Sequence, residues 1–203
     1  MTRRASTCTL ASWLSVTSAL RRFVVSPGRH RPPSTDETGE RQASPRSIEE
    51  KLMTDRKQFM VDGQAVILEV LDTAGIDQYL ALHDLFMRES DGFILVFSLM
   101  SKESFDDVVR TRDQILRLKQ EDLVPMVIVG NKCDLTADRV LPPQLGEQLA
   151  ARAGGVYLET SARNNVNVMR VFHEVVRQMR LHPTRDMKER EARRKKEKKC
   201  VIL

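Results

Sequence analysis

Polar residues follow three predicted strands of this chain, at the point where each strand ends. The segments are Asp72-Thr73-Ala74-Gly75, Asn131-Lys132-Cys133-Asp134 and Glu159-Thr160-Ser161-Ala162. Their carboxylate, amide and hydroxyl groups can hold a polar ligand through directional hydrogen bonds. Because ligands of open α/β sheets bind at the carboxyl ends of the strands, these three segments are the candidate binding residues.

The elements expected to position these segments alternate between strand and helix from Arg56 onward. Apolar runs of strand length, the first two separated by the hairpin signal Asp62-Gly63, predict strands at Lys57–Val61, Ala65–Leu71, Gly92–Leu99, Met126–Gly130 and Val156–Leu158. Apolar residues at helical spacing predict helices at Leu80–Glu89, Lys102–Lys119, Pro142–Ala153 and Val166–Met179. Strands that alternate with helices and are apolar on both faces are typical of an α/β fold with a doubly wound, mostly parallel sheet.

Composition and charge divide the 203 residues into three parts. Residues 1–47 are rich in Ser, Thr, Arg and Pro, which predicts a disordered leader or a wrongly assigned first exon. Residues 48–182 are expected to form the α/β domain, and residues 183–203 a basic tail. The positive charge lies in the two ends, and the middle is mildly acidic. Since a nucleic-acid binder carries basic residues on the folded face that contacts phosphate, we expect no nucleic acid as a partner.

Cysteine spacing and hydropathy exclude further classes of protein. Cys8, Cys133 and Cys200 lie far apart, with no CxxC and no nearby His pair, which excludes a disulfide framework and a zinc module. The longest apolar stretch has about the length of one buried strand, far below the ~20 residues of a membrane helix.

The three strand-end segments, in this order, resemble those of the Ras superfamily of small GTPases. The resemblance covers about Arg56–Arg180, and within it Arg112–Leu135 and Asn165–Arg180 are most similar to the Rap branch, including its bud-site relatives in fungi. It implies the small-GTPase type of fold, binding of GTP or GDP with Mg²⁺, and GTP hydrolysis as the enzymatic activity. It also implies effector proteins, exchange factors and GTPase-activating proteins as partners.

The resemblance assigns the second and third segments to the base of the nucleotide. Asp134 would accept hydrogen bonds from the N1–H and exocyclic N2–H₂ of guanine, a pair of donors that adenine lacks. Asn131 would link the two loops, and Lys132 would pack its stem over the base. The backbone N–H groups of Ser161-Ala162 would bind the guanine O6, with Arg163 where the family usually has Lys. The alternative, an Asx-type turn after a strand, requires no ligand.

The first segment resembles the family's Walker-B turn. Asp72 would hold Mg²⁺ through water, and the Gly75 N–H would contact the γ-phosphate. Ile76 follows where Ras has a Gln that orients the attacking water, and its side chain can neither donate nor accept a hydrogen bond, so we expect slow unaided hydrolysis and assign no catalytic residue. Ser47, in Ser47-Ile48-Glu49-Glu50, resembles the switch I Thr that binds Mg²⁺; the alternative is a helix that begins with Ser47 as its N-cap.

The phosphate-binding loop of the family, GxxxxGK[ST], has no match in residues 1–55. The nearest stretch, Ala11–Leu20, lacks both glycines and has Thr17 in place of the Lys. Since the backbone of that loop cradles the phosphates, its absence leaves nucleotide binding and enzymatic competence open. The first, central strand of the family is also expected to be missing or degenerate, which would leave two neighbouring strands unpaired. A truncated gene model of a Rap-like GTPase is one interpretation.

The C-terminal residues Cys200-Val201-Ile202-Leu203 have the C-a-a-X form, and the terminal Leu indicates geranylgeranylation of Cys200. The preceding basic run, Lys188–Lys199, adds attraction to anionic lipid. We expect a membrane-anchored GTP/GDP switch in signal transduction, on the cytoplasmic face of the plasma membrane or an endomembrane. A nucleotide-free pseudo-GTPase or scaffold with the same anchor is the alternative function. Because the start of the chain is rich in Arg and Ser, mitochondrial targeting is the minor alternative for its location.

Overall fold

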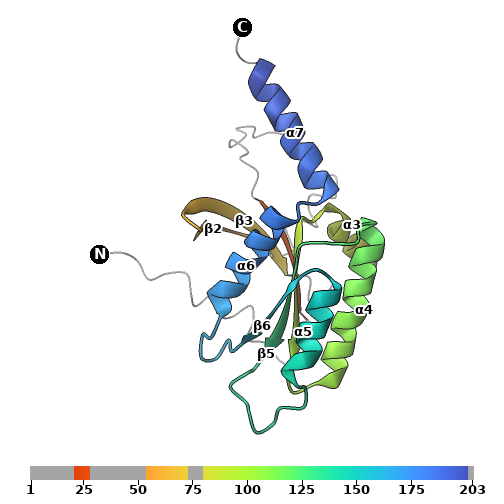
Figure 1. Cartoon of the computed structure of the whole chain (residues 1–203), viewed down its shortest axis with the longest axis vertical. Helices are drawn as coiled ribbons and strands as arrows, with labels where there is room; N and C mark the ends of the chain where they lie inside the picture. Colours follow the sequence, from red (N-terminus) through yellow and green to blue (C-terminus); the bar gives the residue numbers. More distant parts are fainter. Residues whose placement is uncertain (1–20, 28–53, 73–79, 201–203) are drawn as a thin grey trace, which may run out of the picture.

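The computed structural model describes residues 21–27, 54–72 and 80–200, with side chains for 56–71 and 84–193. Its elements, in chain order, are β1 Arg21–Pro27, β2 Thr54–Val61, β3 Gln64–Asp72, α3 Leu80–Glu89, β4 Gly92–Ser98, α4 Lys102–Lys119, β5 Met126–Asn131, α5 Pro143–Arg152, β6 Val156–Thr160, α6 Val168–Leu181 and α7 Arg185–Cys200 (Figure 1). Every strand and helix predicted between residues 57 and 179 is present, with ends that differ by at most three residues.

The β2–β3 hairpin turns at Asp62-Gly63, as the sequence predicts. Both residues have positive φ angles, 52° and 76°, which a two-residue type I′ turn requires. The Arg177 side chain of α6 donates hydrogen bonds to both Asp62 carboxylate oxygens, at 2.6 and 3.0 Å. These bonds hold the pKa of Asp62 below its ordinary value and attach the turn to α6.

The described strands form one sheet in the order β2-β3-β1-β4-β5-β6. Strands β4, β5 and β6 are parallel, whereas β1 is antiparallel to both β3 and β4. The fold is a doubly wound α/β fold, as predicted. Its sheet, however, is mixed rather than mostly parallel, because the hairpin and β1 contribute antiparallel pairs.

Strand β1 decides between the two expectations for the central strand, which was predicted to be missing or degenerate: it is present, but antiparallel to both of its neighbours. Arg21–Pro27 lies between β3 and β4 and pairs with both of them, so the domain includes residues from before position 48. The run Phe23-Val24-Val25 favours a strand, but the Ser-, Arg- and Pro-rich composition around it obscured that signal. The strand begins beside Val96, near the carboxyl end of β4, and Pro27 pairs with Leu68 at the opposite edge. The rest of the predicted leader lies outside the described residues.

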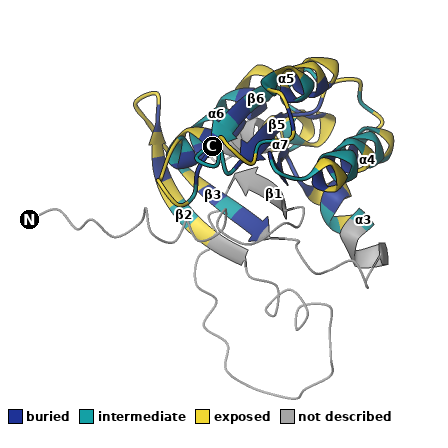
Figure 2. Ribbon diagram, turned by 90° about the horizontal axis from the view of Figure 1, so that it is seen from below, coloured by how far each residue is buried: buried dark blue, intermediate teal, exposed yellow. Residues whose placement is uncertain are grey.

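Helices cover both faces of the sheet, which gives the fold two hydrophobic layers. Helix α6 packs on one face, and α3, α4 and α5 pack on the other. Figure 2 shows the buried residues concentrated in the central strands and on the helix faces that are turned toward them. The α6 layer is centred on side chains that are 0% exposed, namely Val61, Leu68, Ile94, Val127, Val129, Val171, Phe172 and Val175. This packing holds the strand ends in fixed positions.

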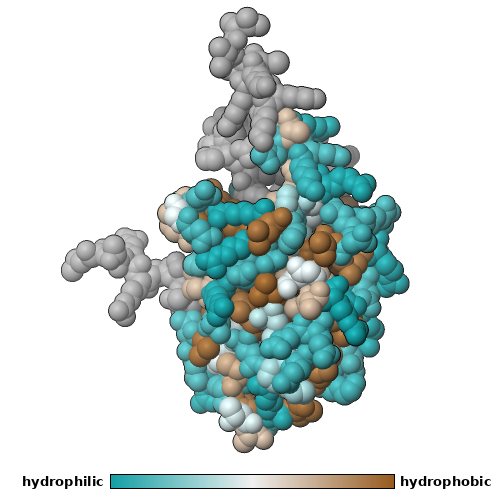
Figure 3. Space-filling view, viewed as in Figure 1, coloured by the Kyte–Doolittle hydropathy of each residue, from teal (hydrophilic) through white to brown (hydrophobic). Residues whose placement is uncertain are grey.

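The described part of the face shown in Figure 3 is mostly hydrophilic. On the face shown in Figure 3, hydrophobic residues form scattered spots among polar ones. Within the described residues, no helix is long and apolar enough to cross a membrane.

Candidate functional site

The parallel strands bring the second and third polar segments together at the carboxyl edge of the sheet. Ser98 of β4 pairs with Asn131 of β5, and Asn131 pairs with Thr160 of β6. Asp72 of β3 is level with Ile94, four positions before Ser98 in the register, or about 13 Å along the strand direction. The second and third segments therefore share one edge, and Asp72, the one described residue of the first segment, is set back from them along the strand direction.

A buried polar link joins the loops after β5 and β6. The Thr160 hydroxyl donates to the Asn131 side-chain oxygen at 3.2 Å, and the Cys133 N–H donates to the Thr160 carbonyl at 3.0 Å. Thr160 is 0% exposed and Asn131 is 6% exposed. Buried hydrogen bonds of this kind hold both loops in one relative position. The Asn131 side chain thus connects the ends of β5 and β6.

Lys132 produces the turn that presents Asp134. Its φ angle of 69° lies in the left-handed region, and its carbonyl accepts a hydrogen bond from the Leu135 N–H at 3.1 Å. The left-handed region is uncommon for residues other than glycine, so this conformation is a specific feature of the loop. The turn reverses the chain directly after β5 and leaves the side chains of Lys132 and Asp134 half-buried at the edge of the sheet.

The carboxylate of Asp134 lies against the loop after β6. A hydrogen bond with the Ser161 side chain lowers the pKa of Asp134, and the charges of Arg163 and Lys132 lower it further. Partial burial opposes this shift but is the smaller effect. Asp134 is therefore ionised at neutral pH and can only accept hydrogen bonds.

The Ser161–Val166 loop narrows the choice of backbone donors. Ser161 is 0% exposed, and its N–H donates to the Val166 carbonyl at 3.2 Å. Since this bond engages one of the two N–H groups predicted to contact a ligand, the N–H of Ala162 is the remaining candidate. Ala162 is half-buried against the α6 layer, and Arg163 is exposed.

Sequence reasoning missed a second support of this edge, formed by Arg139, Tyr157 and Glu159. The Arg139 guanidinium donates two hydrogen bonds to the Glu159 carboxylate, at 2.5 and 3.0 Å, and its Nε donates to the Leu141 carbonyl at 2.7 Å. The Tyr157 hydroxyl also donates to Glu159, at 3.0 Å. Arg139 holds the pKa of Glu159 below its ordinary value, whereas burial raises the pKa of Tyr157. The ion pair between Arg139 and Glu159 attaches the long loop that follows β5 to strand β6.

Two glycines make room for the Tyr157 ring. A Cβ at Gly130 would lie 2.5 Å from the Tyr157 hydroxyl, and a Cβ at Gly146 of α5 would overlap the ring itself. The ring packs against Phe97, with 6.3 Å between ring centroids. No periodic pattern in the sequence predicts this contact, because Gly130, Tyr157 and Gly146 come from three different elements, β5, β6 and α5.

Asn167 is a further residue that the sequence reasoning missed. Its φ angle is 57°, and its side-chain amide donates to the Glu159 carbonyl at 2.8 Å just before α6 begins. The cluster Asn164-Asn165-x-Asn167 was an available signal, since Asn tolerates the left-handed region better than most residues. Through this bond, the start of α6 is attached to the end of β6.

The phosphate end of the predicted site is described only in part. Asp72 is the last residue of β3, with its backbone in place, and Ser47, Gly75 and Ile76 lie outside the described residues. Cys200 ends helix α7. Across residues 56–71 and 84–193, no three His, Cys, Asp or Glu side chains cluster as metal ligands. Asp72 and Ser47 are candidate ligands for Mg²⁺ through the resemblance of their segments to the family.

Comparisons with known proteins identify the family of this chain. The model of the Ras family matches residues 45–181, which include both loops of the carboxyl edge. A Ras-like protein from Laccaria bicolor is 44% identical over 125 residues, which make up 62% of this chain and 60% of that protein. The chain thus spans less than two thirds of this relative. With the family match covering more than half of its residues, the chain belongs to the Ras family of small GTPases.

Proposed function

We propose that this chain is a Rap-like guanine-nucleotide switch whose carboxyl edge recognises the guanine base of GTP or GDP. The observation that carries the proposal is the geometry after β5, where the buried Asn131–Thr160 hydrogen bond and the left-handed turn at Lys132 position the half-buried Asp134. A fixed acceptor at a rigid strand end is what discrimination between purine bases needs, because a hydrogen-bonding site rejects ligands that leave its polar groups unpaired.

Recognition follows from the donors and acceptors of the loop residues. The two Asp134 oxygens accept from the N1–H and N2–H₂ of guanine, whereas adenine has an acceptor at N1 and no amino group at C2. The N–H of Ala162 is available to donate to the guanine O6. In the proposal the Lys132 stem covers one face of the base, and the left-handed backbone of Lys132 begins the turn that carries Asp134.

Binding of the phosphates depends on residues at the other end of the edge. Asp72 would hold Mg²⁺ through water, Ser47 would ligate it directly, and the Gly75 N–H would contact the γ-phosphate. Mg²⁺, when bound, neutralises charge on the β- and γ-phosphates. Ile76 cannot orient a water molecule, so hydrolysis without a GTPase-activating partner is slow.

A nucleotide-free scaffold is the second candidate, and the direction of β1 favours it. The strand ends at Pro27 beside Leu68, so a loop directly after it begins at the edge opposite Asn131 and Thr160. No GxxxxGK[ST] motif is present to cradle the phosphates. On this alternative, the same fold binds protein partners through its surface, and the loops after β5 and β6 have a structural role without binding a nucleotide.

The C-terminus supports membrane anchoring in either case. Geranylgeranylation of Cys200 supplies one lipid chain, and the basic run of α7 supplies the second attraction that stable anchoring needs. On this proposal the switch lies on the cytoplasmic face of the plasma membrane or an endomembrane, where effectors, exchange factors and GTPase-activating proteins would act on it. The alternative location is the mitochondrion, if the Arg-rich start of the chain directs import.

Titration of the purified full chain with fluorescent GDP and GTP analogues tests the proposal. Saturable, Mg²⁺-dependent binding is expected, and Asp134→Asn should weaken guanine nucleotides while it favours xanthine nucleotides, whose C2 carbonyl accepts from the new amide. Asp138→Asn is the matched control, since Asp138 is exposed in the same loop. Absence of saturable binding by the wild-type chain would select the scaffold.

A further inference from the structure

The base of helix α7 is fixed to the domain, at the edge of the sheet opposite the candidate site. Thr184, which is 0% exposed, caps the helix: its hydroxyl accepts from the Met187 N–H at 3.4 Å, and its carbonyl accepts from the Lys188 N–H at 3.1 Å. The Met187 side chain packs against the α6 layer. The first turn of α7 is therefore part of the folded body.

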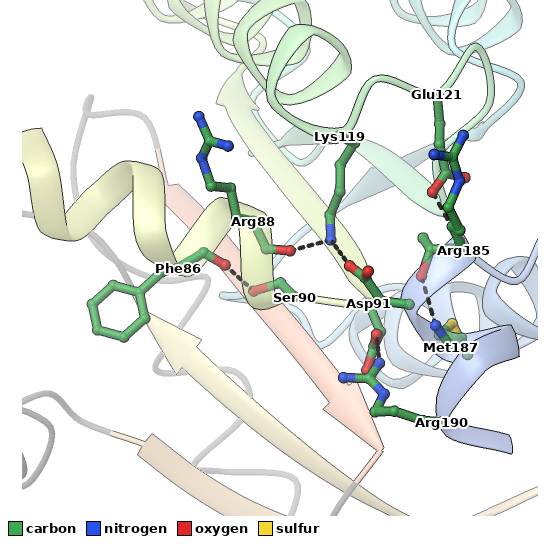
Figure 4. Close-up of polar contacts among 11 residues, drawn as sticks. Phe86, Arg88, Ser90, Asp91, Lys119, Glu121, Arg185, Met187 and Arg190 are labelled. Atoms are coloured by element: carbon green, nitrogen blue, oxygen red, sulfur yellow. Dashed lines mark hydrogen bonds and ion pairs between the residues drawn. The ribbon is translucent and has the colours of Figure 1, made fainter. Parts of the chain in front are cut away.

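The end of helix α4 holds this turn from the side (Figure 4). The Glu121 carboxylate accepts from the Arg185 N–H at 2.9 Å, where a negative charge favours a helix N-terminus. The Lys119 ammonium donates to the Arg88 carbonyl and pairs with Asp186 at 3.4 Å. The Lys119 side chain is 3% exposed, so this cation lies within the contact between α3, α4 and α7.

The most buried ion pair of the contact joins Arg190 to Asp91. Asp91 directly precedes β4, and its side chain is 1% exposed, whereas Arg190 lies on the second turn of α7 and is 39% exposed. Figure 4 shows the Arg190 guanidinium directed at the Asp91 carboxylate. Because a buried carboxylate that loses a partner is costly, Asp91 opposes the release of α7.

Beyond Arg190 the helix leaves the body. Glu191, Ala192 and Arg193 are exposed, and the helix continues to Cys200 (Figure 1). Residues 191–200 contain six Lys or Arg and two Glu. The only apolar residues of α7 before Cys200 are Met187 and Ala192, so the helix has no apolar stripe with which to lie in a membrane interface.

We propose that the ion pair between Asp91 and Arg190, called the lock below, holds α7 in one direction relative to the domain. In this arrangement the basic end of α7 contacts an anionic bilayer, and the candidate site faces away from that bilayer. The inference rests on the membrane anchoring proposed above. Its occupant is an anionic lipid surface, because the projecting residues 191–200 are strongly basic and end at the prenylation cysteine.

The distances along the molecule support this orientation. Strand β4 separates Asp91 from Ser98 at the carboxyl edge by seven residues, or about 23 Å. The ten residues after Arg190 extend the helix by about 15 Å on the other side. With the lock closed, the loops of the site are held at the far end from the bilayer, accessible to nucleotide and partners.

Hydrogen exchange of the unprenylated full chain tests the lock. Asp91→Asn and Arg190→Gln should each speed exchange of the α7 amides from Met187 to Arg193 at least tenfold. Asp122→Asn and Arg193→Gln are matched controls, because they change the same charges at exposed positions of α4–β5 and α7 and should alter exchange less than twofold. Arg190 is the more exposed partner of the pair, so Arg190→Gln remains decisive if Asp91→Asn fails to fold. Equal exchange in all variants and the wild-type chain would overturn the lock.

Binding to vesicles tests the orientation. The same chains carry a dye on an azidophenylalanine at position 138, near the site, and phosphatidylserine–phosphatidylcholine vesicles carry an acceptor lipid. Energy transfer from the dye to the acceptor lipid should be low in the wild-type chain and in Arg193→Gln. It should be at least twofold higher in Arg190→Gln, although Arg190→Gln and Arg193→Gln each remove one positive charge. Equal transfer, or no binding to these vesicles beyond that to neutral ones, would overturn the proposal. Since the assay contains no nucleotide, that failure would leave the proposed guanine switch to its own test.

Discussion

The ion pair between Arg139 and Glu159 gives the sharpest prediction for stability. Arg139→Met keeps the length of the side chain but removes three hydrogen bonds, two to the carboxylate and one to the Leu141 carbonyl. Exposed pairs contribute up to about 1 kcal/mol, and breaking a fully buried pair costs about 3–5 kcal/mol. The two side chains are 24% and 26% exposed, which is between these cases, so we expect a loss of about 2 kcal/mol at pH 7.

The loss should depend on pH in a defined direction. Arg139 lowers the pKa of Glu159 in the folded state, so the pair stabilises the fold above the unfolded pKa of 4.5 and loses that contribution as the pH falls through the folded pKa. The difference between Arg139→Met and the wild-type chain should therefore shrink toward pH ~3.5. Urea unfolding, followed by circular dichroism at both pH values, measures it.

A double-mutant cycle with Glu159→Gln isolates the pair itself. Arg152→Met, at the exposed end of α5, is the control for loss of one positive charge. A coupling energy below about 0.5 kcal/mol, or a loss that does not change with pH, would refute the reasoning. Because the pair holds the loop that carries Asp134, nucleotide affinity should fall with stability in these variants.

Four further changes have expected outcomes. Gly146→Ala should lower the free energy of unfolding by about 2 kcal/mol, since the new Cβ overlaps the Tyr157 ring; a gain of the ~1 kcal/mol that Ala contributes in a helix would contradict the packing. Phe172→Ala, at a 0% exposed position of α6, should cost about 3–5 kcal/mol in the same urea assay. Ile76→Gln should raise the unaided rate of GTP hydrolysis in single-turnover measurements, and no change would count against an intact phosphate site. Cys200→Ser should release a tagged chain from membranes to the cytosol in cell fractionation, whereas retention would show that prenylation is not the anchor.

Local sequence signals predicted most elements of the fold because each depends on neighbours along the chain. The Asp62-Gly63 turn follows from the tolerance of these residues for positive φ, and α4 begins and ends where its apolar spacing predicts. The segments after β5 and β6 were also predicted as parts of one site. The carboxyl ends of parallel strands lie at one edge of a sheet, so the positions of Asn131 and Ser161 directly after two predicted strands were enough to predict that they lie close together.

What only the tertiary structure decided concerns partners that are distant in the sequence. The position and direction of β1 depend on which strands accept it, and a run such as Phe23-Val24-Val25 fits either direction equally well. The Arg139–Glu159 pair and the Arg190–Asp91 lock join residues 20 and 99 positions apart. No periodic pattern encodes such contacts, because the energy of an ion pair depends on the burial and distance of two side chains that only the packed fold brings together.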